Sequence, residues 1–248
     1  MVRKRLITVL TVNNGVLFRT RNFIPDYRYT LSFVDAWSVD EVILLDITRP
    51  GEGNRENFYK VVKRFARHCF VPLTVGGGVR EIEDFKTLLG MGADKVAINY
   101  KAATEPEFIT EAAKLFGTQC VVVSIDAKLR NNKEYEVYTH FGNSPLGTSP
   151  DQLAKKASKY GAGEILIQSI DKDGTLEGYD NHLNKLISNT VDIPVLVCSG
   201  AGSWKDFVDG FKHGGASAVC TTNIYHFTEN SIRSAKQFLQ KADIDVRI

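Results

Sequence analysis

The sequence predicts an α/β protein, a single (β/α)8 TIM barrel domain over residues 1–248 with an internal half-barrel repeat. Three observations lead to this fold class. The chain has the length of one such barrel, roughly 250 residues. Eight near-continuous apolar runs alternate with segments of helical periodicity, which is typical of a parallel sheet covered on both faces. The third observation is the repeat.

The repeat relates motifs of the two halves of the chain. LLDIT, VPLTVGGG and GADKVAI are echoed by QSIDKDGT, IPVLVCSGAG and GASAVCT, at an offset of about 120 to 125 residues. Two half-barrels explain this offset, and eight units favour a closed barrel over an open sheet. In such a barrel the residues just past each strand lie at the C-terminal mouth, where the chemistry takes place.

Each predicted strand is a short apolar run rich in β-branched residues. The first is followed by the turn signal Asn-Asn-Gly and a hairpin-like extension over Val16–Arg19. In chain order the strands are predicted over Arg5–Val12, Glu41–Asp46, Val71–Val75, Lys95–Ile98, Cys120–Asp126, Glu164–Ile170, Pro194–Cys198 and Ala218–Thr222.

The predicted helices carry apolar residues at helical spacing between these strands. They are predicted over Thr30–Trp37, Phe58–His68, Ile82–Leu89, Pro106–Phe116, Asp151–Tyr160, Asn181–Asn189, Trp204–Lys212 and Ile232–Lys241. Three connections lack such a pattern and are predicted as loops or insertions: Thr48–Asn57, the polar stretch Lys128–Pro150, and the Gly-rich stretch Asp171–Gly178.

Composition excludes several classes of function. A hydrophobic content of 43% and a charged content of 24% are ordinary for a globular protein with a full core, and no apolar run is long enough to cross a bilayer. The N-terminus MVRKRLITVL is a first strand in pattern, because it lacks a small-residue cleavage site. We therefore expect a cytoplasmic protein without a membrane partner. The net charge of +2 gives no reason to expect a nucleic acid partner.

Cysteines and histidines show no metal-binding spacing. Cysteines 69, 120, 198 and 220 form no CxxC and lie in or beside apolar runs, which favours buried reduced thiols over disulfides or zinc ligands. The histidines at positions 68, 140, 182, 213 and 226 share no ligand spacing. The run DKDGT at Asp171–Thr175 lacks the rest of a calcium loop, so a turn is favoured. We expect neither a metal nor a cofactor.

Glycine loops and carboxylates at strand ends are the candidates for chemistry. Gly76–Gly78 stands between a strand and a helix, where uncovered N–H groups and the helix dipole can hold an anion. Gly200–Gly202 echoes it across the repeat, so the two loops together could hold a ligand with two phosphate-like ends. The carboxylates that end apolar strands are Asp46, Asp126 and Asp171. For Asp126 we expect that nearby Lys128 keeps the carboxylate ionised as a base.

The chain resembles the HisF family, the cyclase subunit of imidazole glycerol phosphate synthase, over essentially its whole length. The matching stretches are VGGGVR, GADKVAIN, FGTQCVVVSIDAK, YGAGEILIQSIDKDGTLEGYD, SGAG, IYHF and IDVR. The resemblance implies a barrel that docks a HisH-like glutaminase on its N-terminal face, passes ammonia through the barrel and uses it on a phosphorylated substrate at the mouth.

The resemblance also implies roles for individual residues. The charged ammonia gate of the family matches Arg5, Glu41, Lys95 and Glu164. Without the resemblance these would form a buried ion-pair ring, which is costly unless every charge is paired. The positions implied for phosphate or substrate binding are Arg19, Asp46, Gly77, Gly78, Asn99, Asp173, Gly174, Gly200, Gly202, Thr222 and Asn223.

Departures from the family pattern gather at the mouth. The family has catalytic aspartates at the ends of strands one and five; here Asp126 is kept, but Thr11 stands at the other position. A hydroxyl has no accessible pKa near neutrality, and loss of one general acid or base typically costs about 10²–10⁴-fold in rate. Further departures are Arg19 in place of lysine, Tyr100 in place of a small hydroxyl residue, and Gln168 in place of threonine. In the last two loops, Cys198-Ser199 stands where the family has serine–glycine, and Thr222-Asn223 stands where it has alanine–serine.

A kept gate with a rebuilt mouth favours a HisF-like paralogue that receives ammonia for another acceptor. The chain resembles the branch associated with amidation of surface-polysaccharide sugars, in which the barrel and a glutaminase supply a sugar amidotransferase that forms an acetamidino group on a nucleotide-linked sugar. The alternatives are a true histidine-pathway cyclase, a non-catalytic scaffold that activates the glutaminase, and a phosphoribosyl isomerase. Thr11 counts against the cyclase and the isomerase.

Overall fold

The computed structural model describes residues 3–29, 39–131, 133–221 and 232–247. Eight parallel strands form a closed barrel in the order β10-β11-β12-β1-β4-β5-β6-β7, and pairing of β10 with β7 closes it. These strands are β1 (Arg5–Asn13), β4 (Glu41–Asp46), β5 (Leu73–Gly76), β6 (Lys95–Ile98), β7 (Val121–Leu129), β10 (Glu164–Ser169), β11 (Val195–Cys198) and β12 (Ala218–Thr221). The predicted (β/α)8 barrel is confirmed.

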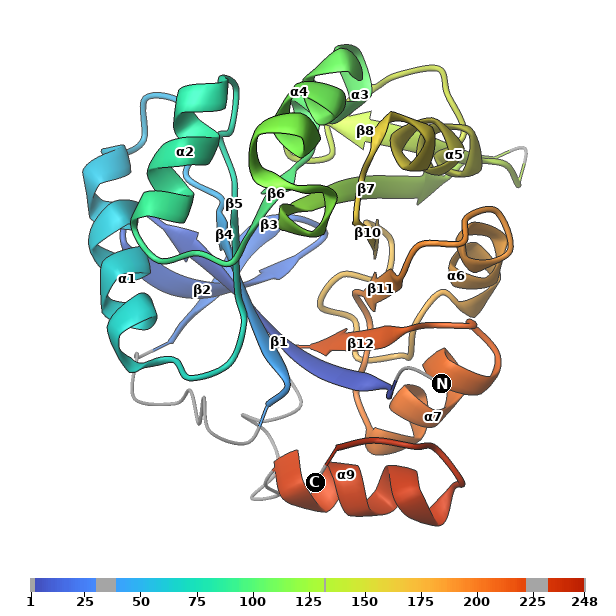
Figure 1. Cartoon of the computed structure of the whole chain (residues 1–248). Coiled ribbons are helices and arrows are strands. Elements are labelled where there is room, and N and C mark those ends of the chain that lie inside the picture. Colours follow the sequence, from blue (N-terminus) through green and yellow to red (C-terminus); the bar gives the residue numbers. More distant parts are fainter. Residues whose placement is uncertain (1–2, 30–38, 132, 222–231, 248) are drawn as a thin grey trace.

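The helices lie outside the strands (Figure 1). They are α1 (Arg55–His68), α2 (Ile82–Gly90), α3 (Tyr100–Thr104), α4 (Glu107–Phe116), the 3-10 helix η2 (Thr118–Cys120), α5 (Pro150–Tyr160), α6 (Asn181–Ser188), α7 (Trp204–Lys212) and α9 (Ile232–Lys241). In α1 the Asn54 side chain caps the first turn by accepting from the Glu56 N–H, and Phe58, Val62 and Phe65 turn one apolar stripe to the strands. The α3 turn is absent from the sequence prediction.

Alternation along each strand divides the core into two parts. Side chains that point outward pack under the helices, and those that point inward form a separate cluster inside the barrel. The inner cluster consists of Ile7, Val9, Ile43, Ala97, Val122, Leu166, Leu196, Ala218 and Cys220, with Leu45 and Cys198 partly buried beside it. Every inward residue is two positions from the next, so inward columns run from one end of the barrel to the other.

Two antiparallel extensions stand on the C-terminal side of the barrel strands. β1 continues into β2 (Val16–Arg21) and β3 (Ile24–Tyr29), and β7 continues into β8 (Tyr135–Thr139) and β9 (Ser144–Pro145). The polar insertion predicted over Lys128–Pro150 is present and contains this second hairpin, whose strands the prediction did not include. The hairpin has one solvent-exposed face, so polar residues alternate with apolar ones along it. Because of this, its overall composition is as polar as that of a loop.

The remaining predicted boundaries agree with the structure to within about three residues at each end. The helix predicted over Thr30–Trp37 lies outside the described residues. No described helix is long and apolar enough to span a membrane. The DKDGT run is a turn, as predicted, closed by N–H to C=O bonds from Asp173 to Ile170 and from Thr175 to Lys172.

Candidate functional site

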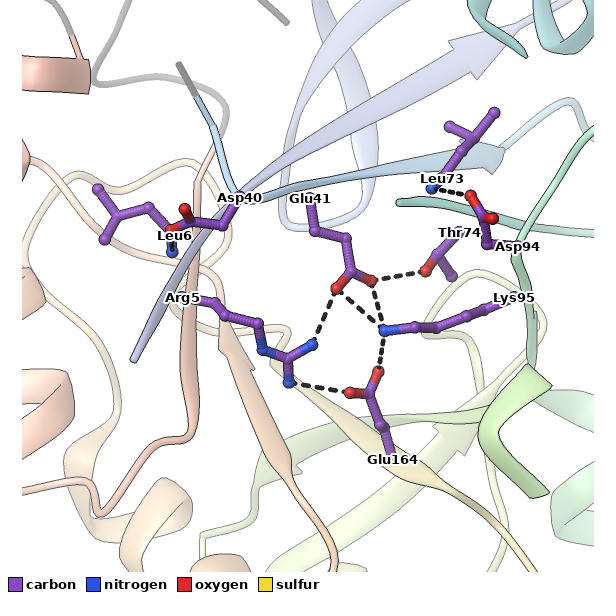
Figure 2. A network of polar contacts seen from close by, with 9 residues as sticks. All are labelled: Arg5, Leu6, Asp40, Glu41, Leu73, Thr74, Asp94, Lys95 and Glu164. Atoms are coloured by element: carbon purple, nitrogen blue, oxygen red, sulfur yellow. Dashed lines mark hydrogen bonds and ion pairs between the residues drawn. The ribbon is translucent and has the colours of Figure 1, made fainter. Parts of the chain in front are cut away.

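The four gate residues predicted from the resemblance form one ion-pair ring at the N-terminal end of the barrel (Figure 2). Arg5 lies 2.9 Å from an oxygen of Glu41 and 2.9 Å from an oxygen of Glu164. Lys95 Nζ closes the ring from the other side, at 3.0 Å from Glu41 and 2.8 Å from Glu164. Two positive and two negative charges therefore alternate around the ring, and each contacts both neighbours.

Further hydrogen bonds fix this ring in place. The Thr74 hydroxyl donates to Glu41 at 2.8 Å, so the almost fully buried Glu41 carboxylate binds three donors. Burial alone would lower the pKa of Arg5, but the charges of Glu164 and Glu41 outweigh it and raise that pKa. Just outside the ring, Asp40 and Asp94 accept from the N–H groups of Leu6 and Leu73 and hold the strand ends (Figure 2).

Strand alternation connects this ring to the mouth. The inward columns rise from Arg5 to Thr11 on β1, from Lys95 to Asn99 at the end of β6, and from Glu164 to Gln168 on β10. Between the two polar ends lies the apolar inner cluster. The apolar interior of the barrel thus forms a central column that separates the charged ring from the polar groups at the mouth.

The mouth contains two adjoining cavities. The larger cavity, of about 260 Å³, is lined on one side by Asp46, Gly77 and Gly78 and on the other by Asn99 and Asp126. The smaller cavity, of about 50 Å³, is lined by Arg19, Asp173, Gly174, Ser199 and Gly200. Thr11, Thr20 and Gln168 line both cavities and therefore stand at their boundary.

Asp126 is the buried carboxylate of the larger cavity. Burial raises its pKa to about 7, and the charge of Asp173 acts in the same direction. Hydrogen bonds from Gln168 at 3.0 Å, Asn99 at 3.2 Å and Ser124 at 3.5 Å oppose this shift, because they favour the ionised form. A carboxyl that titrates near neutrality and faces a cavity is suited to general acid–base catalysis.

The predicted influence of Lys128 on Asp126 is wrong. Lys128 is exposed beyond the barrel rim, and its ammonium lies 6.0 Å from the ring centre of Tyr138 on the neighbouring hairpin strand. It is not among the groups that shift the pKa of Asp126. Residues two apart on a strand share a face, but the strand carries them almost 7 Å apart, and the hairpin supplies a closer partner for the lysine.

Thr11 uses its hydroxyl within the first hairpin. The Thr11 Oγ1 donates to the carbonyl oxygen of Phe18 on β2, which pairs with β1 at this register. Thr11 therefore lines both cavities, but its hydroxyl hydrogen is donated to a backbone carbonyl. Asp126 is left without a second carboxylate from β1.

The Gly76–Gly78 loop has a cationic neighbour that sequence reasoning missed. Gly77 and Gly78 have positive φ angles of 97° and 64°, and a Cβ at Gly78 would collide with the Arg55 guanidinium. Arg55 donates to the Gly77 carbonyl at 3.1 Å and to the Tyr59 hydroxyl at 2.8 Å. Its Nη2 is buried and has no hydrogen-bond partner in the part of the chain that the structure describes, with the Asp84 carboxylate 4.0 Å away. Arg55 and Arg80 also line the larger cavity.

No pattern within the sequence could have paired Arg55 with the glycines. Arg55 opens α1, and the glycines follow β5 more than twenty residues later. The available signal was weaker: an arginine at the first turn of a helix that follows a barrel strand must lie near the mouth. The predicted cradle thus gains a side-chain cation beside its backbone donors.

In the second glycine loop the predicted residues are used differently. Gly200 and Gly174 line the smaller cavity, whereas the Gly202 N–H donates to the Asp206 carboxylate, the N3 residue of the α7 capping box, at 3.0 Å. Ser199 has a positive φ of 79° and is 7% exposed, and its hydroxyl oxygen has no hydrogen-bond partner among the described residues. Thr222 and Asn223 lie outside the described residues.

The other predicted positions are held by neighbouring loops. Arg19 pairs with Asp26 at 2.6 Å, and Asp173 accepts from the Phe23 N–H at 2.9 Å. Burial raises the pKa of Asp173. Asp46 accepts from the Thr48 N–H at 3.0 Å, and Asp171 accepts from the Leu129 N–H at 2.8 Å.

Sulfur and histidine groups form no metal site in the described part of the chain. All four cysteines are free thiols, but only Cys220 is fully buried, so the prediction of burial is wrong for the other three. No cluster of three or more His, Cys, Asp or Glu residues that could hold a metal occurs among the described residues.

A model of the histidine biosynthesis protein family matches residues 8–231, which include all eight barrel strands except the first three residues of β1. The chain belongs to the histidine biosynthesis protein family. This family of HisF and HisA types consists of barrel enzymes, so the two cavities lie where the family carries out its chemistry.

Proposed function

We propose that this chain is the barrel subunit of a glutamine-dependent synthase. Ammonia released by a HisH-like glutaminase enters at the N-terminal face, passes the ring of Arg5, Glu41, Lys95 and Glu164, and reaches Asp126 through the apolar column. Three features support this path. The ring lies at one end of the column, its charges are fully paired, and the column wall consists of apolar residues that do not bind ammonia.

The acceptor that we propose is a nucleotide-linked sugar, amidated to an acetamidino group in surface-polysaccharide biosynthesis, with a separate sugar amidotransferase as a further partner. The observation that carries this choice is that β1 supplies no carboxylate to act with Asp126: Asp126 titrates near neutrality, while Thr11 donates its hydroxyl to Phe18. One acid–base group suffices for delivery, because Asp126 need only take a proton from ammonium or return it. The amidotransferase then adds the ammonia to the N-acetyl carbon and expels the amide oxygen, activated by a nucleoside triphosphate. The cyclase reaction needs proton transfer at two positions of one substrate.

A histidine-pathway cyclase is the second candidate, and membership of the histidine biosynthesis family favours it. It would have to work with Asp126 alone. The non-catalytic scaffold is the third candidate. It leaves unexplained why a buried carboxylate is kept at a cavity, since such a group costs folding free energy wherever it is ionised.

The decisive test supplies the purified barrel with ammonium and the bisphosphate intermediate of the histidine pathway. We expect native turnover at least about 10²-fold below that of an authentic cyclase assayed in parallel, because one of two acid–base groups is missing. The Thr11→Asp variant restores the second carboxylate, and Thr11→Val is the control that keeps the side-chain shape. Native turnover at the authentic rate would overturn the amidation proposal.

A second assay separates delivery from scaffolding. Glutamine, the glutaminase, the barrel, the sugar amidotransferase, a nucleotide-linked N-acetyl sugar and ATP, which activates the amide oxygen for departure, are combined. Amidated sugar is measured by mass spectrometry. Under our proposal the native barrel supports product and Asp126→Asn reduces it, while glutamine hydrolysis continues in both. If Asp126→Asn forms as much amidated sugar as the native barrel, the barrel is a scaffold.

A further inference from the structure

Four ring side chains gather at the outer rim of the larger cavity. Phe23, Tyr100, His140 and Phe141 all line it, together with Asn99 and Asp126 deeper inside. They come from three separate elements: the β2–β3 turn, the start of α3 and the β8–β9 turn. We name this group the aromatic rim.

The rings are held in position rather than packed away. Tyr100 is 40% exposed although it is a large aromatic residue, and its ring meets the edge of His140 at 4.8 Å between centroids and 68° between planes. The Arg49 guanidinium lies 5.5 Å from the centre of the Phe141 ring. The Thr139 hydroxyl lies 3.2 Å from a ring nitrogen of His140. A partly exposed face beside a T-shaped pair is a surface on which a planar ring can stack.

Backbone strain accompanies three of these rings. Phe23, His140 and Phe141 have φ angles of 62°, 51° and 60°, a left-handed conformation that bulky residues rarely adopt. Glycine would relieve the strain at each position, and the residue that follows Phe141 is itself a glycine, Gly142. Strain of this kind persists where the surrounding structure holds a side chain at a ligand site.

The same cavity is also lined by a cation, the Arg55 guanidinium. Arg55 reaches the Gly77–Gly78 loop, and its buried Nη2 makes no hydrogen bond with the described residues. Arginine presents paired donors to a phosphate group. One cavity therefore combines a phosphate-type anchor with a stacking surface for a planar ring.

From this combination we infer that the larger cavity is a nucleotide subsite, in which Arg55 and the Gly77–Gly78 loop bind a phosphate and the aromatic rim stacks on the base. The inference rests on the proposed function, because it places the nucleotide part of the acceptor at the mouth of the barrel. It assigns Tyr100 and Phe141 as specificity residues for a base and Arg55 as the residue for the phosphate.

The test compares ligands that differ only in the base. Binding of uridine 5′-monophosphate, adenosine 5′-monophosphate and ribose 5-phosphate to the full chain is measured by calorimetry. We expect the nucleotides to bind at least about tenfold more tightly than ribose 5-phosphate, the gain typical of one stacked base. Equal affinities for all three would overturn the inference. This test uses no ammonia, so it can fail while ammonia delivery succeeds, and the reverse.

Two variants separate the two halves of the subsite. Tyr100→Ala should remove most of the preference for nucleotides and leave ribose 5-phosphate binding unchanged. Arg55→Gln should weaken all three ligands by a similar factor and keep the preference. The matched aromatic control is Phe70→Ala, whose ring is 71% exposed and does not line the cavity. If Tyr100→Ala and Phe70→Ala behave alike, the rim does not bind the base.

A final competition identifies the source of the nucleotide. A nucleotide-linked hexosamine is titrated against bound uridine 5′-monophosphate. Displacement at a similar concentration assigns the subsite to the sugar acceptor, and a much weaker effect assigns it to a free nucleotide. Unfolding of the Tyr100→Ala and Arg55→Gln variants would show as a lost thermal transition, so a binding defect is accepted only where that transition is kept.

Discussion

The two ends of the barrel are built on opposite principles. At the N-terminal end every charge of the Arg5, Glu41, Lys95 and Glu164 ring contacts two opposite charges. At the C-terminal end the polar groups are incompletely matched: among the described residues no cation pairs with the buried Asp126, and the Ser199 hydroxyl has no hydrogen-bond partner. Buried polar groups that all have partners need no ligand for their stability. Buried polar groups that lack partners cost folding free energy, and a ligand that supplies those partners can recover it.

The largest expected effect comes from breaking the matched end. Lys95→Met leaves the buried Glu41 and the partly buried Glu164 with one cation between them, which should lower the free energy of unfolding by about 3–5 kcal/mol. Urea denaturation measures this loss. The control is Lys86→Met on the surface of α2, whose lysine is 68% exposed and should cost less than about 1 kcal/mol.

A compensating change tests the reason for that loss. Adding Glu41→Gln to Lys95→Met leaves one intact Arg5 and Glu164 pair and removes the uncompensated charge, so part of the lost stability should return. If the double variant is no more stable than Lys95→Met alone, packing rather than charge balance holds this end together.

The second effect concerns the unmatched carboxylate. The pKa of Asp126 rises from 3.8 to about 7 on folding, so the folded state holds a proton that the unfolded state releases between these pH values. The free energy of unfolding contributed by this group therefore falls as the pH rises from about 4 to about 7, by up to about 4 kcal/mol. Asp126→Asn cannot ionise and should be free of this loss.

Thermal unfolding at several pH values checks the prediction. The stability of Asp126→Asn relative to the native protein should increase as the pH rises from about 4 through about 7. It should level off about one pH unit higher, where the native carboxyl is almost fully ionised. A difference between the two proteins that does not change with pH would mean that Asp126 is not held protonated. In assays of amidation, a base with this pKa should gain activity over the same range as it ionises.

The sequence predicts the N-terminal end of the barrel better than the C-terminal end. The residues of the ring were predicted from the family resemblance, and without it they would have been interpreted as a buried ion-pair ring. The barrel strands were predictable from the sequence itself, because strands buried on both faces are continuous apolar runs. Local spacing failed for Lys128, which Tyr138 on the next strand draws away from Asp126.

The mouth was less predictable because distant segments build it. Arg55 reaches the Gly77 carbonyl, and the Phe23 N–H reaches Asp173 about 150 residues away. The rings of the aromatic rim come from two hairpin turns and one short helix, and polar alternation hid the second hairpin. Long-range contacts of this kind depend on barrel closure, which periodicity predicts as a class but not in register.

The smallest effect tests whether strain at the mouth serves a ligand. Ser199 holds a φ of 79° that glycine adopts without penalty, and its buried hydroxyl has no described partner. Ser199→Gly should therefore raise the free energy of unfolding by about 1 kcal/mol, measured by urea denaturation. Because Ser199 lines the smaller cavity, the same variant should bind inorganic phosphate more weakly. A variant that gains stability and loses no phosphate affinity would show that the strained serine does not serve anion binding.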